Sequence, residues 1–106
     1  MALTREYRTT VLDRIKTDQK FAKAIYAEAL DALLTGETAE GLSMLRDLVH
    51  AQTSFKELAK RTGFDEKSLH RILSHRGNPT ARTLGRIISA IRDDLHLVPH
   101  VTIAAA

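Results

Sequence analysis

Residues 54–73 read SFKELAKRTGFDEKSLHRIL, and this stretch decides the fold. Apolar side chains recur at helical spacing over residues 54–62, and the pattern resumes over residues 66–73. Between them Gly63 can adopt the left-handed conformation that ends a helix. Asp65 can then cap the second helix, because its carboxylate accepts hydrogen bonds from the free amides of the first turn. We therefore predict two short helices joined by a tight glycine turn.

Apolar residues of this segment are expected to fix the angle between the two helices. The small side chain of Ala59 lets the helices approach closely, while Leu58, Leu69 and Ile72 pack between them and Phe64 turns back into the core. A helix held rigidly in this way presents its polar face outward. This is the helix-turn-helix arrangement with which many proteins bind DNA.

The outward face of the second helix carries groups that can hydrogen-bond to the edges of DNA bases. Lysine and arginine donate to guanine, a neutral histidine offers one donor and one acceptor, and serine can contact a base or a phosphate. Our candidate base-reading residues are Lys67, His70, Arg71 and Ser74. Basic residues near the helix ends and in the loop are expected to contact phosphates: Lys56, Lys60, Arg61, Arg76 and Arg82. The alternative is a plain solvated face, with His70 in water or on a phosphate.

The rest of the chain also has helical spacing, so we predict an all-α fold of about five helices with an N-terminal helical extension. Asp18 should cap a helix with an apolar stripe that ends before Gly36. A shorter helix precedes it, another helix opens at residues 37–40, and the last helix follows Pro79 and Thr80. The apolar stripe of the Asp18 helix is Phe21, Ile25, Ala29 and Leu33, and it is widened by Ala22, Tyr26 and Leu30. Residues 98–103 alternate weakly, which predicts an edge strand or a loose tail.

The chain has 106 residues, of which 43% are apolar and 27% are charged, and these values are typical of one globular domain. Within it we distinguish an N-terminal helical segment (1–52), the helix-turn-helix module (53–97) and a C-terminal tail (98–106). No apolar run is long enough to cross a bilayer, and the first residues lack the apolar core of a signal peptide. We therefore expect a cytoplasmic protein that has no contact with membranes.

Charge is distributed unevenly along the chain. Residues 53–92 hold nine lysines and arginines against three carboxylates, whereas residues 17–52 hold three against six. The basic part suits phosphate backbones, and the acidic part suits a basic protein surface. The alternative is a solvated surface on which charges cluster by chance.

We expect no enzymatic activity, no cofactor and no metal. The chain has no cysteine, and Pro99 breaks the helical spacing that would place His96 and His100 together as metal ligands. It lacks a nucleophile elbow and a glycine-rich phosphate loop. Asp93 and Asp94 are adjacent on a helix and point in different directions.

Over residues 18–103 the sequence resembles the lambda-repressor-like, Xre-type helix-turn-helix regulators. The resemblance is carried by Leu58-Ala59, Thr62-Gly63 and Asn78-Pro79-Thr80 at the spacing of that family, together with the apolar positions around them. The segment 68–74, SLHRILS, followed by GNPT at residues 77–80, is more narrowly similar to the HigA-type antitoxins of addiction modules. One departure is Phe55, which stands where such regulators often place a glutamine that contacts phosphate.

The resemblance implies a homodimeric repressor that binds double-stranded DNA at a two-fold operator of its own operon. It also implies a toxin partner, a small basic ribonuclease, which the antitoxin neutralises. An acidic surface could face that partner, and its candidate residues are Glu28, Asp31, Glu37, Glu40 and Asp47. The alternative is a stand-alone Xre-type transcriptional regulator without a toxin.

Overall fold

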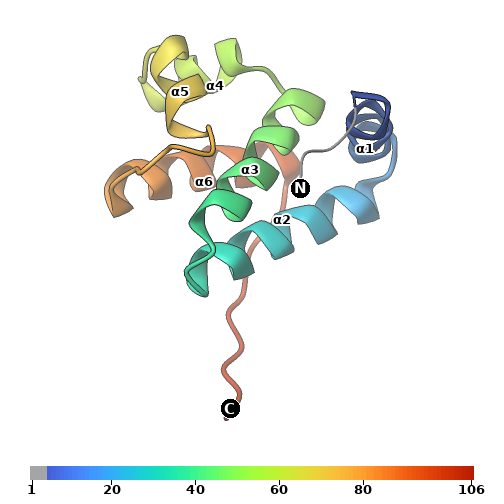
Figure 1. Ribbon diagram of the computed structural model, residues 1–106, viewed down its shortest axis with the longest axis vertical. Helices are drawn as coiled ribbons and strands as arrows, with labels where there is room; N and C mark the ends of the chain where they lie inside the picture. The colour runs from blue at the N-terminus through green and yellow to red at the C-terminus, as the bar shows by residue number, and fades with distance from the viewer. Residues whose placement is uncertain (1–4) are drawn as a thin grey trace.

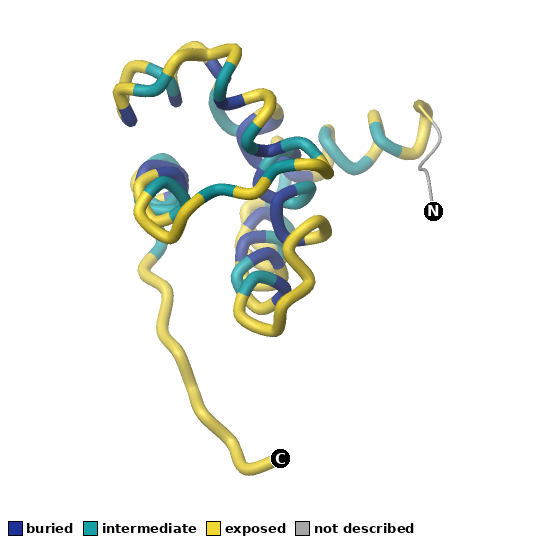
Figure 2. The backbone as a smooth tube through the Cα atoms, turned by 60° about the vertical axis from the view of Figure 1, so that its left-hand side comes forward, coloured by how far each residue is buried: buried dark blue, intermediate teal, exposed yellow. Residues whose placement is uncertain are grey.

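Six helices and no strand make up the computed structural model, which describes residues 5–106 (Figure 1). They are α1 (Arg5–Thr17), α2 (Gln19–Leu34), α3 (Thr38–Gln52), α4 (Phe55–Thr62), α5 (Glu66–Ile72) and α6 (Ala81–Leu95). The prediction of an all-α fold is confirmed. Of the two alternatives for residues 98–103, the structure has an irregular tail and not an edge strand, since residues 5–106 contain no strand that could pair with it. From Val98 onward the tail is exposed. Its residues 98–102 line an open groove together with residues of α2 and α6, and the end of the chain extends beyond the helices (Figure 2).

Local side chains define where the helices begin. Asp18 accepts hydrogen bonds from the amides of Lys20 and Phe21, which confirms it as the N-cap of α2. Thr80 caps α6 in the same way, through the amide of Thr83. Such caps satisfy amides that have no partner within the helix, so these boundaries follow from short-range chemistry.

The central helix of the fold is α3, which contacts α1, α2, α4 and α6. Its residues Leu42, Leu45, Leu48 and Val49 are fully buried. Because the N-terminal helices and the α4–α6 part pack on the same helix, one continuous core connects them.

The predicted apolar side of α2 faces the core, although its main row of residues is not the most deeply buried one. Ala22, Tyr26 and Ala29 are buried, whereas Phe21 and Ile25 are only half-buried. The helices α2 and α3 approach closely where Gly41 faces Ala29 and Leu33 of α2. A Cβ atom at Gly41 would lie 2.6 Å from Cγ of Leu33 and 3.1 Å from the carbonyl oxygen of Ala29. This close contact explains why position 41 is a glycine, although glycine is unfavourable within a helix.

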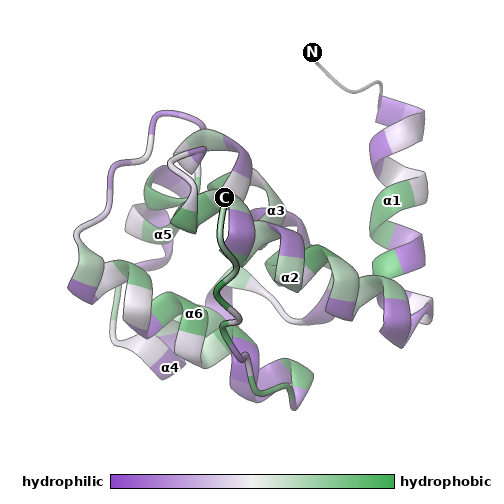
Figure 3. Cartoon of the chain, turned by 90° about the horizontal axis from the view of Figure 1, so that it is seen from below, coloured by the Kyte–Doolittle hydropathy of each residue, from purple (hydrophilic) through white to green (hydrophobic). Residues whose placement is uncertain are grey.

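Helix α1 lies at one side of the molecule and is attached through the apolar side chains of Val11, Leu12 and Ile15 and through polar groups (Figure 3). Ile15 is fully buried, and the Gln52 amide donates to its carbonyl oxygen at 2.6 Å. A guanidinium nitrogen of Arg8 lies 2.8 Å from a carboxylate oxygen of Asp47. Asp47 is buried in this ion pair, so its predicted place on an exposed acidic surface is wrong.

Candidate functional site

The turn between α4 and α5 has the predicted geometry. The hydroxyl of Ser54 accepts a hydrogen bond from the Glu57 amide, and α4 ends at Gly63, whose φ of 80° is left-handed. The carboxylate of Asp65 accepts a hydrogen bond from the Ser68 amide and caps α5. Both helices are therefore fixed at the ends that meet.

Apolar packing holds α5 on the body of the protein. Leu58 on α4, Leu69 on α5 and Leu73 directly after α5 are fully buried. Phe64 and Ile72 are half-buried and pack against this core. Because one side of α5 is anchored in this way, its opposite side must face solvent.

The exposed side of α5 carries three of the four candidate base-reading residues, which are Lys67, His70 and Arg71. Within residues 5–106, neither Lys67 nor Arg71 forms a side-chain hydrogen bond or ion pair. Ser74 differs, because it is half-buried. Its hydroxyl donates to the Arg71 carbonyl oxygen at 2.7 Å and accepts from the Arg76 amide. This serine therefore closes the C-terminal end of α5.

His70 is held by an aromatic contact that the sequence analysis did not anticipate. Its ring stacks on that of Phe55, with 3.8 Å between the centroids and 13° between the planes. On another side, the ring of His50 on α3 lies 4.9 Å from Phe55 at 56°. Burial lowers the pKa of His50 below its ordinary value of 6.5, and the charges of Arg8, His70 and Arg46 lower it further.

The candidate phosphate-contacting residues fall into two groups. Lys56, Lys60, Arg76 and Arg82 are exposed and have no ion pair in the described part of the chain. Arg61 is instead paired with Asp94 on α6, at 2.8 Å between a guanidinium nitrogen and a carboxylate oxygen. Much of its charge is therefore compensated within the protein.

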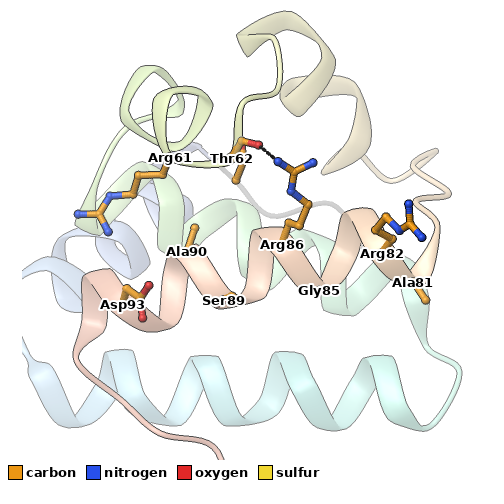
Figure 4. A pocket seen from close by; sticks show the side chains of 9 residues that line it. All are labelled: Arg61, Thr62, Ala81, Arg82, Gly85, Arg86, Ser89, Ala90 and Asp93. Atoms are coloured by element: carbon orange, nitrogen blue, oxygen red, sulfur yellow. Dashed lines mark hydrogen bonds between the residues drawn. The ribbon is translucent and has the colours of Figure 1, made fainter.

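Arg86 has a structural contact that its position in the sequence did not reveal. From α6 its guanidinium donates to the Thr62 carbonyl oxygen at 2.6 Å and lies 4.8 Å from the centre of the Phe64 ring. Figure 4 shows this hydrogen bond in an open groove that Arg61 and Arg82 also line. Only the tertiary structure could identify this contact, because 24 residues separate Arg86 from Thr62.

Other candidate chemistry is not gathered into a site. His96 has a left-handed backbone at the end of α6, and His100 lies in the extended tail. Across residues 5–106, no group of three or more histidine, aspartate or glutamate residues is placed to hold a metal ion. No helix in the same range is long and apolar enough to cross a membrane.

Comparison with family models, curated proteins and solved structures finds no match for this chain.

Proposed function

We propose that this chain is a lambda-repressor-like helix-turn-helix protein that binds operator DNA in a sequence-specific manner and represses transcription in the cytoplasm. The observation that carries the proposal is the arrangement of α5. Leu69 and Leu73 anchor one side of the helix and its C-terminal end, while Lys67, His70 and Arg71 are exposed on the other. A rigid, exposed and basic helix of this kind fits the major groove of DNA.

In the proposed complex, α5 lies in the major groove and hydrogen-bonds to base edges through Lys67 and Arg71. The four unpaired basic residues around it contact phosphates and set the orientation of the protein. Two copies related by a two-fold axis would read half-sites about 34 Å apart, which is one turn of DNA. This role requires no catalytic group, cofactor or metal.

Selection from a pool of random DNA duplexes tests this proposal directly. We expect an enriched sequence with two-fold symmetry, and binding to the enriched duplex that weakens steeply as salt rises, because phosphate contacts release counterions. Binding that does not change between low and moderate salt would contradict the proposal. Enrichment of no sequence would reduce it to non-specific DNA binding.

Replacing Arg71 by alanine separates base reading from general attraction. We expect a loss of about 1–3 kcal/mol on the enriched sequence, together with relaxed preference at one base pair. Equal weakening on all sequences would make Arg71 a phosphate contact. The matched control is Arg92→Ala. Arg92 lies in the last turn of α6 and pairs with the neighbouring Asp93.

A second function, that of an antitoxin, is favoured by the acidic residues near the α2–α3 turn. Glu28, Asp31, Glu37 and Glu40 are all exposed. The turn lies on the side of the helical body away from α5 in Figure 1, so a basic protein there would leave α5 free. Co-purification with the product of a neighbouring small basic reading frame would support this function. Lysine substitutions at Glu37 and Glu40 should then weaken the complex but leave DNA binding intact.

A further inference from the structure

The stack of His70 on Phe55 covers one face of an exposed imidazole. Phe55 is the first residue of α4 and is only 4% exposed, so its ring belongs to the core. His70 belongs to the exposed face of α5, between Lys67 and Arg71 in the chain. The parallel rings, 3.8 Å apart, therefore connect the core to the surface that we propose for DNA.

This contact restricts the orientation of the imidazole. The terminal torsion of a histidine is otherwise broad, so an exposed ring samples many planes. Stacking on a buried ring selects one plane, and aromatic pairs are stabilised beyond the area that they bury. The polar nitrogens of imidazole lie on the ring edge, which stacking leaves free to form hydrogen bonds.

Phe55 itself has little freedom to move. The ring of His50 contacts it from α3, and the hydroxyl of Ser54 caps the helix at the preceding residue. Both neighbours hold the Phe55 ring in place before DNA binds. A preformed orientation reduces the side-chain entropy that His70 loses on binding.

We propose that Phe55 is a positioning residue that fixes the His70 imidazole so that its edge reads one purine in the major groove. This inference rests on the proposed function. Both purines present the N7 acceptor in that groove, whereas cytosine presents an N4 donor and thymine presents its O4 acceptor at a different position. An imidazole N–H held at a set angle therefore favours a purine at that position. If Phe55 served packing alone, its loss would weaken binding equally on every sequence.

Four variants of the full chain test this proposal, and one of them, His70→Ala, removes the imidazole itself. Phe55→Leu keeps an apolar core residue and removes the stack, whereas Phe55→Tyr keeps the aromatic ring. Phe21→Leu is the matched control, because Phe21 is a half-buried aromatic residue of α2 that lies under the guanidinium of Arg14. Thermal unfolding followed by circular dichroism establishes that each variant is folded.

The first measurement uses the protein without DNA. Carbon protons of the His70 ring, observed by NMR, should be shifted upfield by the stacked phenyl ring. Phe55→Leu should abolish this shift, while Phe55→Tyr and Phe21→Leu should retain it. Absence of the upfield shift in the unaltered protein would overturn the inference, whatever the protein does with DNA.

The second measurement is selection from random duplexes at one fixed salt concentration. Phe55→Leu should lose about fivefold or more of the discrimination between purine and pyrimidine at one base pair, which is the size of one base contact. Phe55→Tyr should restore it, and His70→Ala should lose preference at the same base pair. A uniform loss across all sequences, or a loss at a different base pair, would overturn the inference and leave DNA binding standing. Failure of the unaltered protein to bind any duplex would instead overturn the proposed function, and the inference with it.

Discussion

The guanidinium of Arg86 donates a hydrogen bond to the carbonyl oxygen of Thr62 at 2.6 Å, and thereby ties α6 to the last residue of α4. The same group lies over the ring of Phe64 in the turn. A carbonyl at the end of a helix has no partner within the helix, so Arg86 satisfies an acceptor that the turn leaves open. The α4–α5 turn is thus supported from a helix that follows it in the chain.

Replacing Arg86 by methionine should destabilise the protein by about 1–3 kcal/mol, since it removes a charged hydrogen bond and a cation–π contact. Chemical denaturation measures this change. Arg82→Met is the matched control: Arg82 is also exposed on α6 and has no hydrogen bond or ion pair within residues 5–106. We expect Arg82→Met to leave stability unchanged and to weaken DNA binding. Equal stability of the two variants would show that Arg86 does not support the turn.

Gly63 should tolerate alanine poorly. Its φ of 80° is unfavourable for a residue with a Cβ atom, so Gly63→Ala should lower the free energy of unfolding by about 1–2 kcal/mol. Available space is not the cause, because the nearest atom to an added Cβ would be 3.6 Å away. Gly85→Ala provides the contrast. Gly85 lies within α6 with nothing within 4 Å of an added Cβ, and alanine there should stabilise by about 0.5–1 kcal/mol. Thermal unfolding of both variants measures these changes. A stabilised Gly63→Ala or a destabilised Gly85→Ala would contradict the prediction.

Lys60 and Arg61 should respond differently to loss of charge, although they are adjacent. Lys60 has no ion pair within the described residues, whereas Arg61 is paired with Asp94. Lys60→Gln should therefore reduce the slope of log affinity against log salt by about one, as expected for one lost phosphate contact. Arg61→Gln should change the slope less and destabilise the fold more. Identical slopes for the two variants would mean that the Asp94 pair opens when DNA binds.

The lowered pKa of His50 predicts a dependence of stability on pH. Its pKa lies below 6.5 in the folded protein, so the unfolded chain takes up its proton first as pH falls. Stability attributable to His50 is complete above about pH 6.5 and decreases as pH falls from there through the folded pKa. His50→Gln should therefore lose less stability than the unaltered protein between pH 7 and about pH 5, as measured by denaturant midpoints.

A suitable control for this comparison is His75→Gln, since His75 is exposed. The burial of Asp47 changes the pH dependence of stability in the opposite direction to that of His50. It raises the pKa of that carboxyl, against the effect of Arg8, so the folded protein binds that proton more readily than the unfolded chain does. Comparing variants at each pH cancels this shared contribution. A His75→Gln curve that follows the His50→Gln curve would refute the assignment to His50.

The sequence by itself determined the helices and the turn between α4 and α5. Asp18, Ser54, Gly63 and Asp65 act on residues within a few positions of themselves, and helical periodicity needs only one side of the helix to be buried. The exposure of Lys67 and Arg71 followed from the same periodicity. Such features depend on short-range interactions, which the order of residues records directly.

Only the tertiary structure decided which polar groups remain available for a ligand. Asp47 is paired with Arg8, Arg61 with Asp94, and His70 is stacked on Phe55, each across two different helices. The depth of burial along α2 has the same origin, since the close approach at Gly41 places Ala29 and Leu33 against α3. These contacts join residues that are far apart in the chain. Their distances depend on how whole helices pack, and no local pattern specifies that packing.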